Sequence, residues 1–414
     1  MADRRGAALQ RLRGAHETAL LAELRRSGGL SRSELIERSG LSRTTVFAIV
    51  SDLLASKTLV ERPRAASGGT DGQDPAAQGA SGAGTSAARG RPAMSVFLNP
   101  RGAQLIGIGL LRTRLQIVIA NHAHELVSRC TVPLAAEAGP GERVAAVGAA
   151  VDAMVAAHGI SLAAVAGVGL GLPGLVRRRD QEPPDAASAE ARIVSALGER
   201  FGTPVLTDNN TRLAALAETT WGAARDLSHI VYLQWSDRVG GGLVIDGRLV
   251  RGAHGAAGEI GHTSCDPQGP PCYCGGRGCL EGVIGLPALV DRCRARGVDV
   301  RDGAHLLALA ASGQPAAVDV VREAAATAGR VLAGLAVQID PAAVIVAGEL
   351  AGLGAPVLAA VREQLDTLAL PGAALGITVA ASPLGSEAAA QGAVAMLLRA
   401  AGNAPDGLAS AGAA

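Results

Sequence analysis

A glycine- and proline-rich stretch, residues 251–281, constrains the fold of this chain more than any other. It holds three cysteines within eight residues, and a histidine lies ten residues ahead of the first cysteine. The four residues are His262, Cys272, Cys274 and Cys279. Three thiolates and one imidazole form a common ligand set for a tetrahedral structural zinc ion. Glycine and proline let a short chain fold back so that all four side chains meet at one point.

Two alternatives to zinc are a disulfide and ordinary unliganded thiols. Cytosolic chains rarely keep disulfides, and cysteines clustered beside a histidine favour a metal. The remaining cysteines, Cys130, Cys265 and Cys293, lack this spacing. We therefore predict one structural Zn²⁺ per chain, bound by a zinc knuckle at 262–279.

Two glutamates flank the predicted zinc ligands. Glu259 lies three residues before His262, and Glu281 lies two residues after Cys279. Either glutamate alone would indicate no more than a solvated surface charge. Beside a rigid metal loop, however, both carboxylates are presented to a polyhydroxylated ligand at little ordering cost. Both are therefore candidate ligand-binding residues.

The sequence GAHGAAGEIGH followed by CYCGGRGCLE resembles the signature of the ROK family, which contains sugar kinases and sugar-responsive repressors. The resemblance covers residues 16–62 and 93–400. It implies a two-lobed actin-like (ribonuclease H-like) sugar-kinase fold. It also implies that the four residues listed above bind zinc, and that Glu259, His262 and Glu281 contact sugar hydroxyls.

The charge of the chain is unevenly distributed. Residues 1–64 hold twelve Lys or Arg against seven Asp or Glu, a net charge of +5, although the whole chain carries only +1. A basic amino-terminal segment indicates a polyanion-binding module. No apolar run reaches the roughly 18 residues of a membrane span, and the start, MADRRGAALQRLRG, lacks the apolar core of a signal peptide. We therefore predict a cytoplasmic protein without a membrane partner.

The segment from residue 16 to 62 has the pattern of three short helices. Ser31 and Glu34 have capping-box spacing at the start of the second helix, and Ser42 is the expected N-cap of the third. Two helices joined by a four-residue turn with glycine indicate a helix-turn-helix. Its expected DNA contacts are Ser42, Arg43, Thr44 and Thr45. A three-helix protein-interaction module is the alternative, but the basic charge favours DNA.

The sequence LSRSELIERSGLSRTTVFAIVSDLLASKTLVE also resembles the winged helix-turn-helix that ROK repressors carry and plain ROK kinases lack. Residues 65–88 contain no Val, Ile, Leu, Met or aromatic residue, so they cannot bury enough surface to order themselves. We expect a flexible insertion at 65–92, in the wing, between strands near 58–61 and 93–98. At its end, Arg89 and Arg91 either enter a DNA minor groove or form a charged linker.

At 414 residues the chain is long enough for two or three domains. We expect a winged helix-turn-helix at 1–98, a ROK domain at 99–402 and a disordered tail at 403–414. After residue 104, strands and helices alternate, which predicts the α/β class. The expected strands lie near 105–111, 115–120, 165–170, 205–206 and 344–346, and a helix lies near 142–157.

The chain departs from the ROK kinase pattern at three places that phosphoryl transfer needs. The family's Asp-x-Gly-x-Thr turn places its aspartate at Gly109 and its glycine at Leu111. Its Gly-Thr-Gly-Ile-Gly loop aligns with residues 236–240, Ser-Asp-Arg-Val-Gly. The catalytic aspartate of its Asn-Asp pair aligns with Asn210, and an amide cannot accept a proton as a carboxylate does. We therefore predict that the chain is not an enzyme.

These observations predict a DNA-binding transcriptional regulator of sugar-metabolism genes, a repressor or less often an activator, that resembles the N-acetylglucosamine and xylose repressor group. The expected effector is a sugar or sugar phosphate, bound by Asn209, Asn210, Glu259, His262 and Glu281. The resemblance implies a homodimer, or a dimer of dimers, on palindromic double-stranded operator DNA. Two alternatives stay open: an active ROK sugar kinase with an appended DNA-binding domain, and a repressor released by a protein partner.

Overall fold

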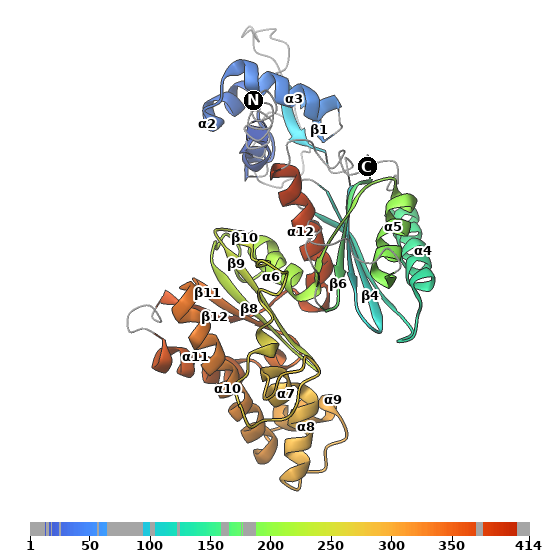
Figure 1. Cartoon of the computed structure of the whole chain (residues 1–414). Helices are drawn as coiled ribbons and strands as arrows, with labels where there is room; N and C mark the ends of the chain where they lie inside the picture. Colours follow the sequence, from blue (N-terminus) through green and yellow to red (C-terminus); the bar gives the residue numbers. More distant parts are fainter. Residues whose placement is uncertain are drawn as a thin grey trace, which may run out of the picture. The chain divides into compact units, whose positions relative to one another are not determined.

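The computed structural model describes residues 13, 16–17, 19–24, 26–55, 58–63, 94–99, 104–121, 125–158, 165–174, 176, 188–369 and 376–403 (Figure 1). The chain divides into two compact units, one up to Gln104 and the other comprising most of the chain from Leu105 onward. The predicted insertion at 65–92, with Arg89 and Arg91, and residues 404–414 of the predicted tail lie outside the described residues.

The first unit is a winged helix-turn-helix. Its described elements are α2 (Arg32–Ser39), α3 (Arg43–Ala55), β1 (Leu59–Pro63) and β2 (Met94–Leu98), and residues 19–24 are also helical. The two strands pair in antiparallel orientation, with Leu59 opposite Leu98. Buried aliphatic side chains from the helices and the strands, among them Leu24, Leu35 and Val50, form one core.

Local capping fixes where the two helices of the helix-turn-helix begin. The Ser31 hydroxyl accepts the N–H of Glu34 at 3.2 Å, and the Glu34 carboxylate accepts the N–H of Ser31 at 2.7 Å, which confirms the predicted capping box. Gly40 ends α2 with φ of 66°, a left-handed conformation that glycine adopts without strain. The Ser42 hydroxyl then accepts the N–H of Thr45 at 3.2 Å, so Ser42 caps α3 as predicted.

The second unit contains two five-stranded sheets, which we call the sheets of the first and second lobes. The first-lobe sheet has the order β5-β4-β3-β6-β7, with α4 and α5 packed on one face (Figure 1). Its elements are β3 (Gln104–Leu110), β4 (Arg114–Asn121), β5 (Leu126–Pro133), α4 (Pro140–His158), β6 (Val165–Leu172), α5 (Ala189–Phe201) and β7 (Val205–Asn209). On the other face, Leu105 and Val118 pack against Ala390 and Val394 of α12 (Ala388–Asn403).

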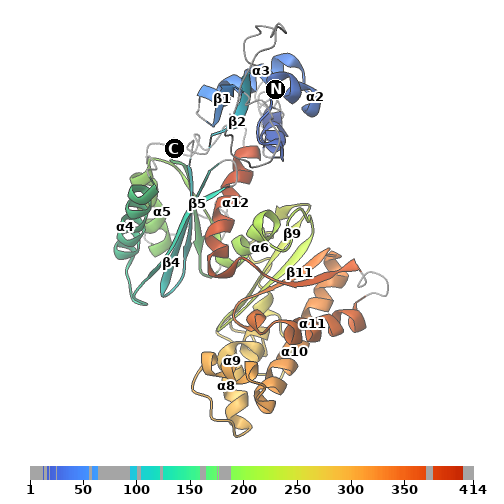
Figure 2. The same cartoon turned by 180° about the vertical axis from the view of Figure 1, so that it is seen from behind.

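The second-lobe sheet has the order β10-β9-β8-β11-β12, and α10 and α11 pack side by side beside it (Figure 2). Its strands are β8 (Ile230–Trp235), β9 (Val239–Ile245), β10 (Arg248–Leu249), β11 (Ala343–Ala347) and β12 (Thr378–Ala381). Its helices are η2 (Ile260–His262), α7 (Leu280–Ile284), α8 (Leu286–Ala295), α9 (Gly303–Ala311), α10 (Pro315–Ile339), η3 (Leu350–Leu353), α11 (Ala355–Leu368) and η5 (Gly385–Glu387). The β11 strand is parallel to β8 and β12, whereas β9 is antiparallel to β8.

Helix α6 (Asn210–Trp221) joins the two lobes. Its Ala215 belongs to the same buried cluster as Tyr232 of the second-lobe sheet, while its Leu213 packs against Ala393 of α12. The contact with α12 is close because residue 392 is glycine: a Cβ there would lie 1.8 Å from the Leu213 carbonyl oxygen. The amino-terminal end of α6 therefore stands where both lobes meet.

The strands predicted from the sequence near 105–111, 115–120, 165–170, 205–206 and 344–346 overlap β3, β4, β6, β7 and β11. The helix predicted near 142–157 overlaps α4. The fold is thus the predicted one, a winged helix-turn-helix followed by a two-lobed α/β domain.

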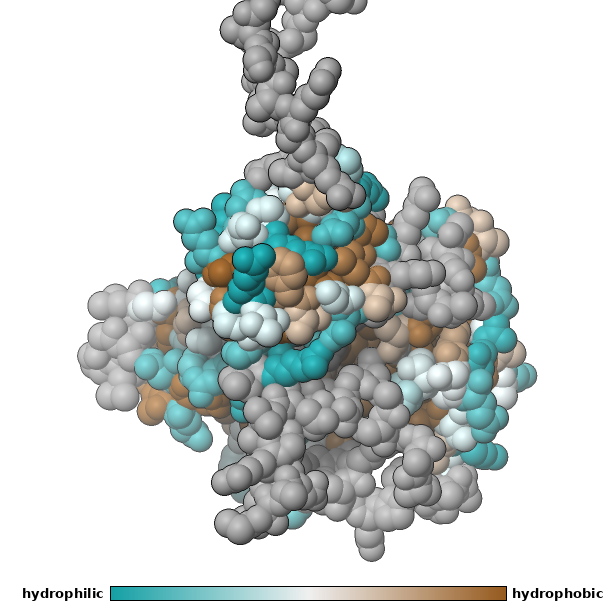
Figure 3. All heavy atoms as spheres, turned by 90° about the horizontal axis from the view of Figure 1, so that it is seen from above, coloured by the Kyte–Doolittle hydropathy of each residue, from teal (hydrophilic) through white to brown (hydrophobic). Residues whose placement is uncertain are grey.

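The described surface carries hydrophilic and hydrophobic residues side by side (Figure 3). Large hydrophobic side chains that are exposed among the described residues are Met94, Leu126, Tyr273, Val337 and Leu368. Tyr273 is the most exposed of them, at 71%, and it lies in the cysteine loop. Within the described residues no single helix is long and apolar enough to cross a membrane. Helices α9 and α10 reach the length and apolar composition of a membrane span only when they are taken together, and they are bent by 105° relative to each other.

Candidate metal, sugar and DNA-binding sites

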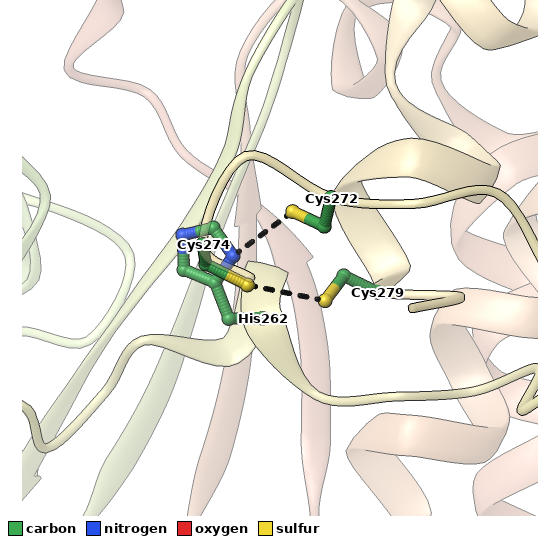
Figure 4. A group of neighbouring side chains, drawn as sticks. All are labelled: His262, Cys272, Cys274 and Cys279. Carbon is green, nitrogen blue, oxygen red and sulfur yellow. Dashed lines mark hydrogen bonds between the residues drawn. The ribbon is translucent and has the colours of Figure 1, made fainter. Parts of the chain in front are cut away.

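The cysteine loop brings its four predicted ligands to one point (Figure 4). Their ligand atoms all lie within 4.8 Å of one another. The Sγ of Cys272 lies 3.6 Å from Nδ1 of His262, and the Sγ atoms of Cys274 and Cys279 are 3.6 Å apart. A disulfide requires a sulfur–sulfur distance of about 2.0 Å. Ligands around a tetrahedral ion with bonds of about 2.0–2.3 Å lie roughly 3.5–3.8 Å apart, so this geometry suits a four-coordinate metal ion.

Backbone hydrogen bonds hold the loop in this shape. The N–H of Cys272 donates to the Gly276 carbonyl at 2.8 Å, and the N–H of Gly278 donates to the Pro270 carbonyl at 2.8 Å. Gly278 has φ of 57°, and a Cβ at this position would lie 1.5 Å from the Asp266 carbonyl oxygen. Only glycine fits there. The predicted folding back of the loop thus depends on specific glycines.

The convergence of thiols has an electrostatic consequence. The N–H of Gly276 and the neighbouring Cys272 lower the pKa of the Cys274 thiol. Burial and the adjacent thiols of Cys274 and Cys272 raise the pKa of Cys279 to about 12. Three thiolates at one point would repel each other, and a divalent cation removes that repulsion. The remaining cysteines, Cys130, Cys265 and Cys293, are not in the cluster.

Glu281, a predicted sugar-contact residue, already has two donors. It lies at the start of α7 with 9% of its surface exposed. Its Oε1 accepts from Nη1 of Arg238 at 2.9 Å, and its Oε2 accepts the N–H of Val239 at 3.0 Å. No local pattern predicts this pairing, because Arg238 lies 43 residues earlier, in the turn between β8 and β9.

Tyr273, between two cysteines of the loop, is a second residue that the sequence analysis missed. Its hydroxyl lies 3.1 Å from Nε2 of His262, and the guanidinium of Arg238 lies 4.8 Å from the centre of its ring. Glu259, half-buried, stands at the N-terminal end of η2, three residues before His262. Burial and the charges of Glu281 and Glu259 raise the pKa of the Tyr273 hydroxyl. Glu259, His262 and Glu281 all belong to the second lobe.

The two asparagines at the start of α6 have different roles. Asn209 is buried and caps the helix: its Oδ1 accepts the N–H of Thr211 at 2.7 Å, and its Nδ2 donates to the Gly174 carbonyl at 2.7 Å. Asn209 thus has a structural role, and its second Nδ2 hydrogen is left for a ligand. Asn210 donates from Nδ2 to the Leu110 carbonyl at 2.9 Å, while its buried Oδ1 has no partner among the described residues.

A buried ion pair stands beside these asparagines. Asp208 and Arg212 are each 1% exposed, and Nε of Arg212 donates to Oδ1 of Asp208 at 2.7 Å. The other carboxylate oxygen accepts from Nε of Arg251 at 2.6 Å. Arg212 also donates to the carbonyls of Gly255 and Val176. The pair thus ties the first lobe to the loop that precedes Glu259.

Gly109, which aligns with the aspartate of the kinases' first phosphate turn, is closely packed against Gln116 and α12. A Cβ at Gly109 would lie 3.0 Å from Oε1 of Gln116 and 3.4 Å from the amide nitrogen of Ala390. Gln116, on β4, is only 1% exposed. These contacts are tighter than usual, so an aspartate at position 109 would require the Gln116 side chain to move by a few tenths of an ångström.

In the first unit, α3 presents the predicted DNA contacts. Ser42, Arg43 and Thr44 are exposed, and Thr45 is half-exposed. The guanidinium of Arg43 lies 5.3 Å from the centre of the Phe47 ring, one helical turn further on. The guanidinium of Arg32, from α2, lies 4.9 Å from the same ring. One aromatic ring thus holds two positive charges near the start of α3.

A winged helix-turn-helix joined to a two-lobed, kinase-like α/β domain defines a class of DNA-binding proteins built on a sugar-kinase scaffold. Residues 105–400 match the model of the ROK family, and residues 16–56 match that of the winged helix-turn-helix DNA-binding proteins. The chain belongs to the ROK family, which confirms the resemblance noted in its sequence.

Repressors and kinases both occur among the similar proteins. The xylose repressor of Bacillus spizizenii is 26% identical over 309 residues, which cover 70% of this chain and 72% of that protein. The crystal structure of a ROK family transcriptional regulator, a homolog of the E. coli MLC protein, has a TM-score of 0.76 at 23% identity and covers 95% of this chain and 97% of its own. A ROK family glucokinase from Streptomyces griseus, in complex with glucose and AMPPNP, has a TM-score of 0.60 at 28% identity and covers 71% of this chain and 99% of its own.

The buried ion pair generates a stability prediction. Arg212→Met leaves the buried Asp208 carboxylate with one cation fewer, so we expect the free energy of unfolding to fall by about 3 kcal/mol or more. The matched control is Arg251→Met, which contacts the same carboxylate with a side chain that is 40% exposed and should cost less. Both tryptophans, Trp221 and Trp235, lie in the second unit, so urea denaturation followed by tryptophan fluorescence reports on it. Equal losses in the two variants would contradict this role of Arg212.

Proposed function

We propose that this chain is a sugar-responsive, DNA-binding transcriptional repressor of sugar-metabolism genes. The observation that carries the proposal is the presence, on one chain, of a winged helix-turn-helix and a ROK domain. The similarity to a xylose repressor over 70% of the chain supports it. In this reading the sugar-kinase scaffold has kept ligand binding and lost the reaction.

Three features support a ROK domain without kinase activity. Asn210 stands where a catalytic carboxylate is expected, and its amide donates to the Leu110 carbonyl instead of accepting a proton. The nearby carboxylate of Asp208 is buried and held by two arginines, so it cannot substitute as a base. Gly109 stands where the first phosphate turn of the kinases has its aspartate, and Oε1 of Gln116 lies 3.0 Å from the Cβ that another residue would carry there.

The proposed sugar site uses the acceptors of the second lobe together with Asn210. Glu259, His262 and Glu281 lie in or beside the cysteine loop of the second lobe, and the buried Oδ1 of Asn210 is an acceptor without a partner among the described residues. An orphaned acceptor is costly, and a sugar hydroxyl would satisfy it. Asn209, the further predicted contact, stays in this set: its Oδ1 caps α6 and one Nδ2 hydrogen binds Gly174, and the second Nδ2 hydrogen can donate to a sugar hydroxyl.

We also propose that the cysteine loop binds one structural zinc ion. Three thiolates and one imidazole are a zinc ligand set, and with four protein ligands the tetrahedron is complete, as in sites that stabilise folds. The ion would fix the loop that carries Glu259 at one end and Glu281 at the other. Cys272, Cys274, Cys279 and Nδ1 of His262 would hold it.

For DNA, the proposed contacts are Ser42, Arg43, Thr44 and Thr45 on α3, with Arg89 and Arg91 of the wing adding affinity. A homodimer, or a dimer of dimers, suits this function because two-fold symmetry presents two recognition helices to a palindromic operator. The described exposure of Arg43 and Thr44 supports this use of α3.

The zinc proposal has a direct test. Cys274→Ser should lower the metal content of the purified protein from one equivalent per chain to nearly none, because serine is a poor zinc ligand and metal binding is coupled to loop folding. Cys130→Ser is the control and should retain the metal. The measurement is elemental analysis by mass spectrometry after dialysis. Full zinc in the Cys274→Ser protein would overturn the assignment.

DNA recognition generates a second test. Arg43→Ala should weaken operator binding by about 1–3 kcal/mol if its guanidinium contacts a guanine edge. Phe47→Leu should weaken it less, because the ring only positions that guanidinium. Arg322→Ala, an exposed arginine on α10, is the control. Fluorescence anisotropy with labelled DNA measures all three, and operator affinity that is unchanged in Arg43→Ala would place the recognition surface elsewhere.

The overall function is tested with the full chain in two assays. Genomic fragments selected by the protein should share a palindrome, and one sugar or sugar derivative should lower the affinity for it by roughly 5–150-fold, as in other allosteric proteins. In parallel, coupled ADP release with hexoses and N-acetylhexosamines should stay at background, since both the base and the phosphate turn are absent. Sugar-dependent turnover near the usual rate of kinases, about 1–100 per second, would favour the kinase alternative. Loss of DNA binding on addition of a protein, with no sugar effect, would favour release by a partner.

A further inference from the structure

Each ring nitrogen of His262 has a neighbour of its own. Nδ1 lies 3.6 Å from the Sγ of Cys272, on the side where the four proposed zinc ligands converge (Figure 4). Nε2 lies 3.1 Å from the hydroxyl oxygen of Tyr273. A neutral imidazole carries a single N–H hydrogen, on one nitrogen or the other. The nitrogen that carries it decides whether Nδ1 is free to bind a metal ion.

A metal ion on Nδ1 fixes this hydrogen on Nε2. The metal takes the lone pair of Nδ1, so the ring hydrogen is then donated outward from Nε2. The Tyr273 oxygen, at 3.1 Å, lies where it can accept that hydrogen. In metal sites the second ring N–H of a ligating histidine is almost always donated to such a partner. The partner orients the ring and raises the basicity of the nitrogen that binds the metal.

Tyr273 is held by contacts at the surface and not by a core. Its side chain is 71% exposed. Its ring stands edge-on to the imidazole of His262, with the ring centres 5.2 Å apart and the planes at 81°. The guanidinium of Arg238 lies 4.8 Å from the centre of the tyrosine ring, and the Glu281 carboxylate accepts a hydrogen bond from that guanidinium at 2.9 Å. These contacts set the position of the hydroxyl.

We propose that Tyr273 is a positioning residue of the metal site, whose hydroxyl oxygen accepts the Nε2–H of His262 and so keeps Nδ1 directed at the zinc ion. Arg238, anchored by Glu281, supports the tyrosine ring. This role rests on the proposed zinc site and extends it beyond the four ligands. Contact between a sugar and His262 then requires the Tyr273 hydroxyl to share the Nε2 hydrogen or to move aside.

The test measures the zinc affinity of the full chain by competition with a chromophoric chelator under reducing conditions. Tyr273→Phe keeps the ring and removes only the hydroxyl. It should weaken zinc binding by about 10–100-fold, the usual loss when the outer partner of a metal-bound histidine is removed. Tyr273→Leu removes the ring as well and should weaken zinc binding at least as much. Arg238→Gln should weaken it less, because the hydroxyl remains.

Tyr232→Phe is the matched control. Tyr232 is the other of the two tyrosines in the chain, and its hydroxyl donates to Gln234 on β8, outside the cysteine loop. This variant also loses one tyrosine hydroxyl, and it should keep wild-type zinc affinity. The cobalt-loaded protein gives a spectroscopic readout. Tyr273→Phe should shift the ligand-field absorption bands, because the basicity of the coordinated imidazole changes, whereas Tyr232→Phe should leave them in place.

The outcomes separate this role from the zinc proposal. Wild-type zinc affinity in Tyr273→Phe would overturn the positioning role and leave the zinc site intact. A loss in Tyr273→Leu alone would mean that the ring acts by packing, and unshifted cobalt bands would mean that the imidazole is unaffected; either result overturns the role of the hydroxyl. An equal loss in Tyr232→Phe would assign the effect to general destabilisation. If the wild-type chain binds no zinc, the zinc proposal and the role of Tyr273 fail together.

Discussion

The buried ion pair between Asp208 and Arg212 is the interaction on which the second unit depends. Both side chains are almost completely removed from water, which costs several kcal/mol per ion before any contact is made. The cost is offset because every part of the pair finds a partner: the carboxylate also binds Arg251, and the guanidinium also binds two carbonyls. Those partners come from both lobes and from the loop ahead of Glu259. The need to pair these buried charges therefore holds the loop at Arg251 and Gly255 against the first lobe.

The start of α6 combines a contact between elements with an unsatisfied polar atom. Nδ2 of Asn210 donates to the Leu110 carbonyl, so the amide ties α6 to the end of β3. Its buried Oδ1 has no partner among the described residues, and leaving such an acceptor unpaired is costly. In the second lobe, the Glu281 carboxylate is paired with Arg238 and also accepts the N–H of Val239, so the start of α7 is tied to the turn between β8 and β9.

Local signals predicted much of this structure from the sequence. The capping box of Ser31 and Glu34, the N-cap at Ser42 and the convergence of the cysteine loop follow from spacing over a few residues, and all are present. The pairing of Arg238 with Glu281 was missed because it joins residues far apart in the chain, and periodicity carries no information about such contacts. The cap that Asn209 makes on α6 was missed for a related reason: a sequence shows that an amide is present but not which way it points. Its use as a helix cap became visible only with the carbonyl of Gly174 in place.

In the wing, the pairing register of β1 and β2 does not depend on the length of the chain that connects them. Strands β1 and β2 pair from Leu59 opposite Leu98 to Pro63 opposite Met94, so the chain leaves and re-enters the hairpin at adjacent points. Thirty residues, 64–93, connect those points. The entropy of closing such a connection grows only with the logarithm of its length, and lengthening a four-residue turn to this size costs about 2 kcal/mol. Adding or removing a few residues in a connection of this length changes the closure cost by only about 0.1 kcal/mol, so the pairing of β1 with β2 tolerates small insertions and deletions here.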